Sequence, residues 1–286
     1  MQLNHQNSKI FAVVPTYNRP NLLCKNIDCL LKQTRKIHSI VIVDNGSSQE
    51  TFNYLFNSGY LKNKKIVYKR LDINQGASFA FAYGMEFSLK HGADMIWAMD
   101  DDAFAKDDAL EILENEYKKN PGHVYWSNCN NQIKSKILEV DIFMFVGFLI
   151  DRETIKQVGY PDASFFMYHD DTDYSIRIRK LNKKIFRVQD SIINHKDWTS
   201  RNTQEIKVLN ILWYKVKLYC GDKSRLYYIC RNEFFLSVSP YKKVKIFLKF
   251  FARAFLYLIF SPKHLSAYFK GFMHGALLKR RGKSVV

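Results

Sequence analysis

The sequence lacks the features that would mark an exported or disulfide-bonded protein. Its 286 residues include five cysteines, an odd number, and none forms a Cys-x-x-Cys pair. We recognise no signal peptide at the N-terminus. Because disulfides persist mainly outside the reducing cytoplasm, we expect reduced thiols in a cytoplasmic protein and assign the cysteines no chemistry.

Acidic residues are absent from the last part of the chain. None follows Glu233, so the excess of positive charge, +17 for the whole chain, is concentrated in the C-terminal region. Four basic residues there are spaced by three or four positions and share one face of a predicted helix: Lys242, Lys245, Lys249 and Arg253. Aromatic and aliphatic residues fill the other faces.

This pattern predicts a basic amphipathic helix. Lys249 and Arg253 interrupt the apolar run before it reaches the ~20 residues that span a bilayer. We therefore expect the helix to lie on an anionic membrane surface, at the inner face of the cell membrane. Alternatively, it packs on the rest of the chain or forms the seam of a homo-oligomer. Nucleic acid is not an expected partner, because the apolar fraction is high and no recognition motif is present.

The first hundred residues alternate short β-branched runs with helical patterns, which predicts an α/β fold with a mostly parallel central sheet flanked by helices. The expected strands are Ile10–Val14, Ile40–Val43, Ile66–Tyr68 and Met95–Met99, and the expected helices begin near Pro20 and at Gln75. Further along, we expect a helix over 107–119 and a continuous apolar strand over 142–150.

Three of the expected strands end in polar clusters. These clusters are Pro15–Arg19, Asp44–Ser47 and Asp100–Asp102. In an open parallel sheet, ligands bind outside the carboxyl ends of the strands, so we expect the three clusters to converge on one crevice.

The three consecutive aspartates are the most informative of these clusters. Adjacent carboxylates at the end of a buried strand repel one another unless a cation neutralises them. Asp100 and Asp102 point the same way in an extended segment and are able to share one hard cation, which prefers oxygen ligands. The alternative is a solvated turn, as we consider for Asp107 and Asp108 nearby.

The order and spacing of four motifs resemble the family-2 glycosyltransferases of the GT-A fold. They are Val13–Arg19, Val41–Ser47, Asn74–Gly76 and Trp97–Asp102. The resemblance covers roughly residues 8–200. Within the family, the segment His169–Tyr174 and the stretch Tyr227–Asn232 look like those of bacterial galactofuranosyl- and rhamnosyltransferases, which are inverting enzymes.

The resemblance implies a role for each motif. It assigns the nucleotide to Pro15, Thr16, Tyr17, Arg19, Asp44, Asn74, Asp100 and Asp101. It assigns a divalent metal, Mn²⁺ or Mg²⁺, to Asp100, Asp102 and His195. It assigns the sugar or acceptor to Asp101, Asp170 and Asp173. Trp198, in a polar loop, is a candidate for stacking on the acceptor, and the alternative is a core residue. Asp171 aligns with the catalytic base.

Several of these roles have competing interpretations. Asp44 also fits an Asp-Asn-Gly turn, and Arg19 also fits a surface arginine. The whole 170–173 cluster also fits a helix cap, and Asp170 is the next candidate for the base. His195 also fits a structural histidine.

We therefore predict a GT-A catalytic domain over residues 1–205 and a helical, basic region over 206–286. The expected activity is metal-dependent, inverting transfer of galactofuranose from UDP-galactofuranose to a hydroxyl of a lipid-linked or growing bacterial surface glycan, with dTDP-rhamnose as the alternative donor. A non-catalytic membrane-surface scaffold is one rival. A nucleotidyltransferase is another, but no glycine-rich or lysine-rich phosphate loop follows the first strand.

Overall fold

The computed structural model describes residues 8–130, 135–195, 206–211, 214–236 and 240–277. These residues form two compact units, each with its own hydrophobic core. Unit 1 contains the described residues of 8–163 and 171–195, and unit 2 contains 164–170 and the described residues of 206–277. Trp198 and the predicted domain boundary at residue 205 lie outside the described residues.

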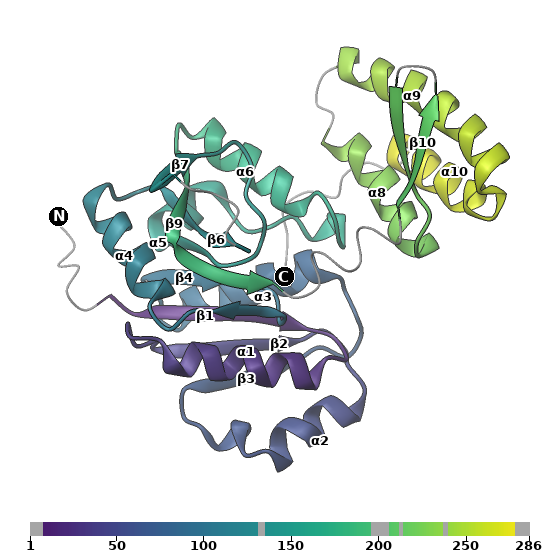
Figure 1. The fold of residues 1–286 in the computed structure, drawn as a ribbon. Helices are drawn as coiled ribbons and strands as arrows, with labels where there is room; N and C mark the ends of the chain where they lie inside the picture. The colour runs from purple at the N-terminus through teal and green to yellow at the C-terminus, as the bar shows by residue number, and fades with distance from the viewer. Residues whose placement is uncertain (1–7, 131–134, 196–205, 212–213, 237–239, 278–286) are drawn as a thin grey trace. The chain divides into compact units, whose positions relative to one another are not determined.

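Unit 1 is an α/β domain built on one large sheet (Figure 1). Its first half consists of β1 (Ile10–Thr16), α1 (Pro20–Lys32), β2 (Ser39–Asp44), α2 (Gln49–Asn57), β3 (Ile66–Arg70), α3 (Ala77–Lys90) and β4 (Met95–Ala98). Its second half consists of β5 (Ala103–Ala105), α4 (Ala109–Lys119), β6 (Val124–Cys129), β7 (Ile137–Glu139), β8 (Phe148–Asp151), α5 (Arg152–Val158), α6 (Asp170–Lys180) and β9 (Ile185–His195).

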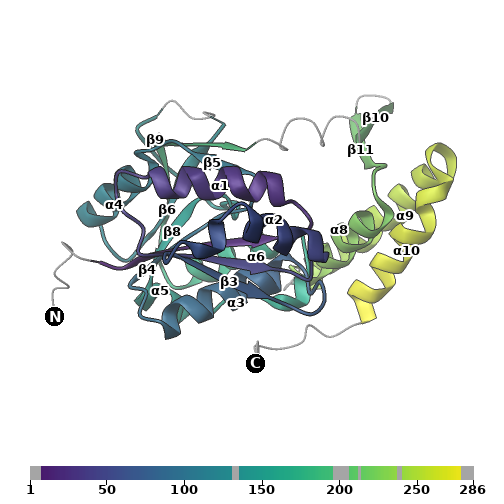
Figure 2. The ribbon, with the colours of Figure 1, turned by 90° about the horizontal axis from the view of Figure 1, so that it is seen from below.

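The strand order is β3-β2-β1-β4-β8-β6-β9-β5, and β7 pairs with β9. The strands from β3 to β4 are parallel, whereas β8 is antiparallel to both of its neighbours. Because parallel crossovers are right-handed, α1 and α2 lie on one face of the sheet and α3 lies on the other (Figure 2). The predicted α/β class is confirmed, but the sheet is mixed rather than mostly parallel.

Helix α3 approaches the sheet closely at Gly84. Gly84 faces Val13 and Val43, and a Cβ atom at this position would come within 2.5 Å of the Val13 Cγ1 atom. The absent side chain therefore allows α3 to approach β1 and β2 closely. This packing fixes the strands whose carboxyl ends carry the first two polar clusters.

The prediction of a strand over 142–150 is wrong for most of its length. Only Phe148–Asp151 forms a strand, and Gly147 before it has a φ of 74°, outside the extended region. Phe143 and Phe145 pack with Phe148 and Tyr174 in an aromatic cluster. Phe143 and Phe145 are thus buried in the core by a segment that is not a strand, which the apolar pattern alone does not distinguish from a strand.

In its described residues, unit 2 combines a two-stranded hairpin with three helices. Its elements are β10 (Ile206–Ile211), β11 (Tyr214–Tyr219), α8 (Lys223–Phe235), α9 (Pro240–Phe260) and α10 (Pro262–Leu277). The C-terminal helices are present as predicted, whereas the hairpin was not predicted. Within the described residues, no helix is long and apolar enough to span a membrane.

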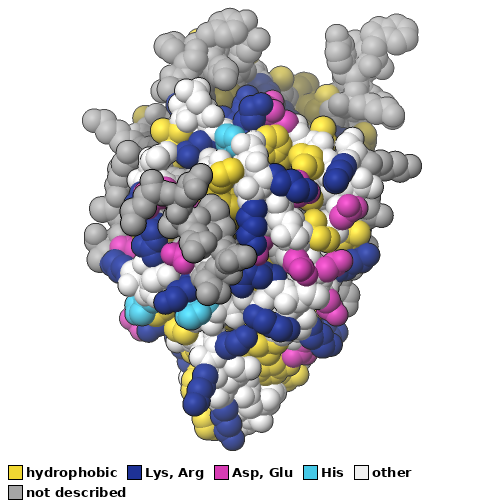
Figure 3. Space-filling view, turned by 90° about the vertical axis from the view of Figure 1, so that its left-hand side faces the viewer, with side chains coloured by type: hydrophobic (Ala, Val, Ile, Leu, Met, Phe, Trp, Pro, Cys, Tyr) yellow, Lys and Arg dark blue, Asp and Glu magenta, His cyan; other side chains and the backbone are white. Residues whose placement is uncertain are grey.

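Charged side chains are mixed on the surface. On the face shown in Figure 3, lysine and arginine side chains are interspersed with acidic and apolar ones. Part of the positive charge on this face is therefore balanced locally.

Candidate active site

The three polar clusters lie at one edge of the sheet, as predicted. Thr16 at the end of β1 is opposite Asp44 at the end of β2, and the Asn45 N–H donates to the Thr16 carbonyl. On the other side of β1, the Met99 N–H donates to the Val13 carbonyl, which brings the aspartates next to the same edge. The register of three parallel strands therefore brings the three clusters together.

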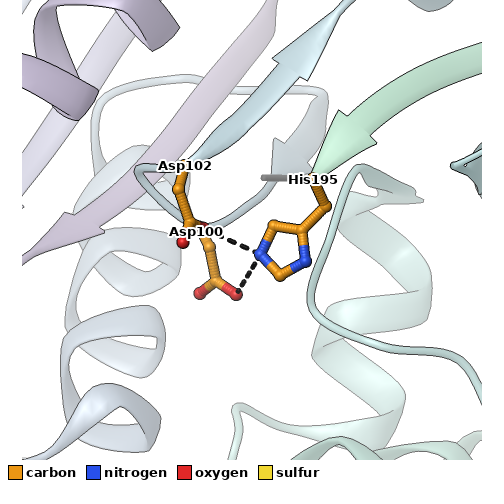
Figure 4. A group of neighbouring side chains, drawn as sticks. All are labelled: Asp100, Asp102 and His195. Carbon is orange, nitrogen blue, oxygen red and sulfur yellow. Dashed lines mark hydrogen bonds and ion pairs between the residues drawn. The ribbon is translucent and has the colours of Figure 1, made fainter. Parts of the chain in front are cut away.

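The register of β5 and β9 brings His195 to the aspartates (Figure 4). Ala103, directly after Asp102, is the antiparallel partner of His195. As a result, the His195 Nε2 atom lies 2.7 Å from Asp102 Oδ1 and 3.8 Å from Asp100 Oδ2. Residues separated by more than ninety positions in the sequence thus converge through one pair of strands.

Asn130 holds the backbone of His195 and was not predicted. Its Oδ1 atom accepts from the His195 N–H at 2.8 Å, and its Nδ2 atom donates to the His195 carbonyl at 3.3 Å. Asn130 has a φ of 53°, a left-handed conformation that asparagine tolerates better than most residues. The only signal in the sequence was a polar segment after an apolar strand, which is common in turns.

Asp100, Asp102 and His195 fit a divalent cation. One ligand atom from each residue lies within 4.8 Å of the other two. An octahedral shell at about 2.1 Å places its ligand atoms about 3 to 4 Å apart, so small side-chain adjustments are sufficient. Two carboxylates and one imidazole match the ligands that Mn²⁺ and Mg²⁺ accept.

The carboxylates do not share one electrostatic environment. Burial, reinforced by the charge of Asp102, raises the pKa of Asp100 to about 7, although 41% of its side chain stays exposed and solvent offsets part of this effect. Burial also tends to raise the pKa of Asp102, but the contacts with His195 and Arg19 outweigh it and lower the pKa to about 2. The Asp102 carboxylate is therefore the member of the cluster whose charged form is most strongly favoured.

Asp101 points to a different set of partners. Its carboxylate accepts from Thr16 Oγ1 at 2.7 Å and from Arg19 at 3.2 Å, and Arg19 also contacts Asp102 at 2.8 Å. Burial raises the pKa of Asp101 to about 6 even though Arg19 and Thr16 favour its charged form. Arg19 is thus tied to the acidic cluster, and its contact with a nucleotide stays a prediction.

Asp44 is fully buried at the end of β2. One of its oxygens accepts from the Ser47 N–H at 2.8 Å, and the other accepts from the Tyr68 hydroxyl. Burial and the bond to Asp44 raise the pKa of Tyr68. Tyr68 was not predicted as a site residue, because a tyrosine inside a strand has no sequence signal that separates it from a core residue.

The neighbouring asparagines link the second and third motifs. Asn45 Nδ2 donates to Asn74 Oδ1 at 3.0 Å, and Asn45 Oδ1 accepts from the Gln75 N–H at 2.9 Å. Tyr17 is 46% exposed at the end of β1, next to Pro15 and Thr16. A hydrogen-bonded polar network and one exposed aromatic ring therefore lie at this edge of the sheet, and the nucleotide contacts assigned to these residues stay predictions.

The second acidic cluster forms the first turn of α6. Asp171 Oδ1 accepts from the Thr172 N–H at 2.6 Å, and the positive end of the helix dipole favours negative charge here. Asp170 is buried, and Asp173 is buried and ion-paired with Arg177 at 2.8 Å. The roles of Asp170, Asp171 and Asp173 in catalysis or acceptor binding stay predictions.

A family model described as glycosyl transferase family 2 matches residues 11–177. The chain belongs to this family and is a glycosyltransferase. The two alternative functions, a nucleotidyltransferase and a non-catalytic scaffold, are therefore not retained.

The chain is similar to two characterised members of the family. The galactofuranosyltransferase GlfT1 of Mycobacterium tuberculosis (strain CDC 1551 / Oshkosh) is 26% identical over 197 residues, which cover 59% of this chain and 64% of that protein. The dTDP-rhamnosyl transferase RfbF of Shigella flexneri is 25% identical over 260 residues, which cover 80% of each chain. The match thus spans less than two thirds of the length of GlfT1.

A solved structure supports the fold. The crystal structure of GalNAc-T7 with UDP, GalNAc and Mn²⁺ superposes with a TM-score of 0.59 at 13% identity, covering 80% of this chain and 48% of that chain. At this identity the likeness concerns the fold alone, and the fold is GT-A.

Replacing Asp102 tests the metal site. We expect Asp102→Asn to weaken Mn²⁺-dependent binding of UDP by about tenfold or more, since even supporting residues of a metal site contribute that much. Titration calorimetry with UDP, in Mn²⁺ and in EDTA, measures the effect. Asp107→Asn, at an exposed aspartate of the same region, is the matched control. An unchanged affinity in Asp102→Asn would remove the residue from the metal site.

Proposed function

We propose that this glycosyltransferase is metal-dependent and inverting, and that it transfers galactofuranose from UDP-galactofuranose to a hydroxyl of a lipid-linked or growing bacterial surface glycan. The observation that carries the proposal is the cluster of Asp100, Asp102 and His195 at the carboxyl edge of the sheet, with their ligand atoms within 4.8 Å. A diphosphate leaving group needs a neutralising cation, and this cluster would hold one.

The donor is the first part of the proposal. The name of GlfT1 favours galactofuranose, and the name of RfbF favours dTDP-rhamnose as the alternative donor. Uracil and thymine both present an imide N–H, and the buried carboxylate of Asp44 is a suitable acceptor for it. Asp44 therefore suits both donors, and the choice depends on the methyl group of thymine and on the sugar.

Inversion requires a base on the acceptor side. In our proposal, the Asp171 carboxylate takes the proton of the acceptor hydroxyl while the hydroxyl oxygen forms a bond to the anomeric carbon. The bond from that carbon to the diphosphate breaks on the opposite face, so the configuration inverts. A bound Mn²⁺ or Mg²⁺ would supply charge neutralisation for the leaving diphosphate.

The segment that leads toward α6 begins near residues that we propose to bind the donor. Ser78 Oγ, near the start of α3, donates to the Asp162 carbonyl at 2.8 Å. Helix α3 begins at Ala77, three residues after Asn74, whose side chain bonds to Asn45. This contact supports an acceptor-side role for the first turn of α6.

Membrane association is the second part of the proposal. The described part of α9 exposes a series of large apolar side chains, namely Val244, Phe247, Leu248, Phe251, Phe255, Leu258, Ile259 and Phe260. No acidic residue follows Glu233, so the sequence of α9 and α10 carries only basic charges. Such a helix suits the surface of an anionic inner leaflet, where a lipid-linked acceptor is presented.

The donor is tested by titration with two nucleotides. We expect UDP to bind in the presence of Mn²⁺, and to bind more tightly than dTDP, with both affinities lost in EDTA. Calorimetry on the purified protein measures all four conditions. Tighter binding of dTDP would favour the rhamnose donor, and metal-independent binding of both would contradict the proposed metal role.

The base is tested by an isosteric substitution. We expect Asp171→Asn to lower the rate of sugar transfer by a factor on the order of 10² or more, because its amide does not accept the proton. UDP affinity should stay near normal, since donor binding does not depend on this carboxylate. The matched variant is Asp170→Asn, next to it in the same turn. If Asp170→Asn loses the activity and Asp171→Asn keeps it, the base is Asp170.

The membrane surface is tested with two substitutions on α9. We expect Leu248→Ser combined with Phe255→Ser to lower the partition onto phosphatidylglycerol vesicles by about tenfold or more, from the lost burial of two apolar side chains. Vesicle sedimentation measures the partition. The control replaces Phe56 and Ile73, exposed apolar residues of unit 1, by serine. An equal loss in the control would mean that α9 is not the docking face.

A further inference from the structure

The segment that precedes α6 has an unusual backbone. Phe166, Tyr168 and His169 all have φ values near the left-handed region, at 64°, 64° and 65°. Large side chains disfavour this conformation, so the surrounding contacts must impose it. Residues 164–169, which we call the acceptor turn, end directly before Asp170, the first residue of α6.

Asn232 of α8 binds this turn from inside unit 2. Its side chain is fully buried, and its Nδ2 atom lies 2.9 Å from the Phe165 carbonyl, 2.7 Å from the Met167 carbonyl and 2.9 Å from the Tyr168 carbonyl. Two N–H groups are thus shared among three carbonyl oxygens. A buried carbonyl without a donor is unfavourable, so this one amide compensates for the irregular path of the chain.

Arg231 completes the same set of contacts. Its guanidinium donates to the Ser164 carbonyl at 2.6 Å and to the Phe165 carbonyl at 2.8 Å, and its Nε–H donates to Asn232 Oδ1 at 2.8 Å. The last bond fixes the orientation of the asparagine amide, with its Nδ2 toward the turn. Arg231 and Asn232, which we call the α8 clamp, therefore act as one donor array.

Aromatic rings brace the clamp. The Phe166 ring stacks on Tyr228 of α8 at 4.6 Å with an interplanar angle of 8°. The Arg231 guanidinium lies over the rings of Tyr228 and Phe235, at 4.7 and 5.1 Å from their centroids. These contacts limit the freedom of both the arginine and the turn.

Helix α10 supports α8 from behind the clamp. A Cβ atom at Gly275 would lie 2.6 Å from the Arg231 carbonyl, and one at Gly271 would lie 2.5 Å from the Tyr227 carbonyl. Only glycine permits this approach of the two helices. The C-terminal region thus has a packing role toward the clamp, in addition to the exposed face of α9.

We propose that Arg231 and Asn232 are positioning residues, which hold the acceptor turn so that the first turn of α6 presents Asp171 to the acceptor hydroxyl. This inference rests on the proposed role of Asp171 as the base. The clamp contacts neither substrate nor metal in this proposal, and it acts through the backbone that leads into α6.

Amide hydrogen exchange tests the clamp without any substrate. We expect Asn232→Ala to accelerate exchange across residues 164–173 by about tenfold or more, with β1 to β4 unchanged. Lys223→Ala, at an exposed position of α8, should leave both regions unchanged. If Asn232→Ala does not fold, Arg231→Lys retains the charge but loses the planar fork, and should accelerate the same segment. Unchanged exchange in the first turn of α6 would overturn the proposal.

A double-mutant cycle then tests the link to Asp171. Transfer from UDP-galactofuranose to octyl galactofuranoside, or from dTDP-rhamnose to octyl rhamnoside, is measured for Asp171→Asn, Asn232→Ala and the double variant. We expect Asn232→Ala to lower kcat by about tenfold with unchanged Mn²⁺-UDP affinity, and to have little further effect in the Asp171→Asn background.

The outcomes separate the two proposals. Losses that multiply in the double variant would mean that the clamp acts independently of Asp171, which overturns the positioning role. If Asp171→Asn alone retains the wild-type rate, the base assignment fails, while the exchange result still decides whether the clamp orders the turn.

Discussion

The repulsion among Asp100, Asp101 and Asp102 is the constraint on which this site depends. Three carboxylates follow one buried strand, and the protein separates their environments rather than exposing them all. Asp101 turns toward Thr16 and Arg19, whereas Asp102 lies between Arg19 and His195. Asp100 keeps the largest exposed surface and faces the same histidine. Arg19 and His195 thus hold these carboxylates by hydrogen bonds. A divalent cation would neutralise the negative charge that remains.

Much of unit 1 was predictable from the sequence because its signals are local. The buried runs at β1, β2 and β4 and the polar clusters after them define both the strands and the edge where the clusters meet. The contacts of Asn130 and Tyr68 were not predictable, because they depend on the register of distant strands. The segment at Phe143 and Phe145 was also missed, since a buried segment that is not a strand and a buried strand share one apolar pattern.

The C-terminal region contributes in two different ways. Its sequence predicts a basic amphipathic helix, and the exposed apolar residues of α9 are consistent with that pattern. The structure adds that α8 and α10 are packed closely enough to exclude side chains at Gly271 and Gly275. This close packing is not predictable from composition, because it depends on which two helices face each other. The region is therefore both a candidate docking surface and the support of the acceptor turn.

The pairing of β5 with β9 has a consequence for how this enzyme tolerates change. Asp102 and His195 meet because Ala103 is opposite His195, and the intervening chain only has to return to this register. Insertions and deletions in the loops between them therefore leave the ligand pair intact. A slip of β9 by one residue against β5 would instead turn the histidine to the other face of the sheet. Divergence in length is thus expected in the loops between the two ligands, and not in the strands that set their register.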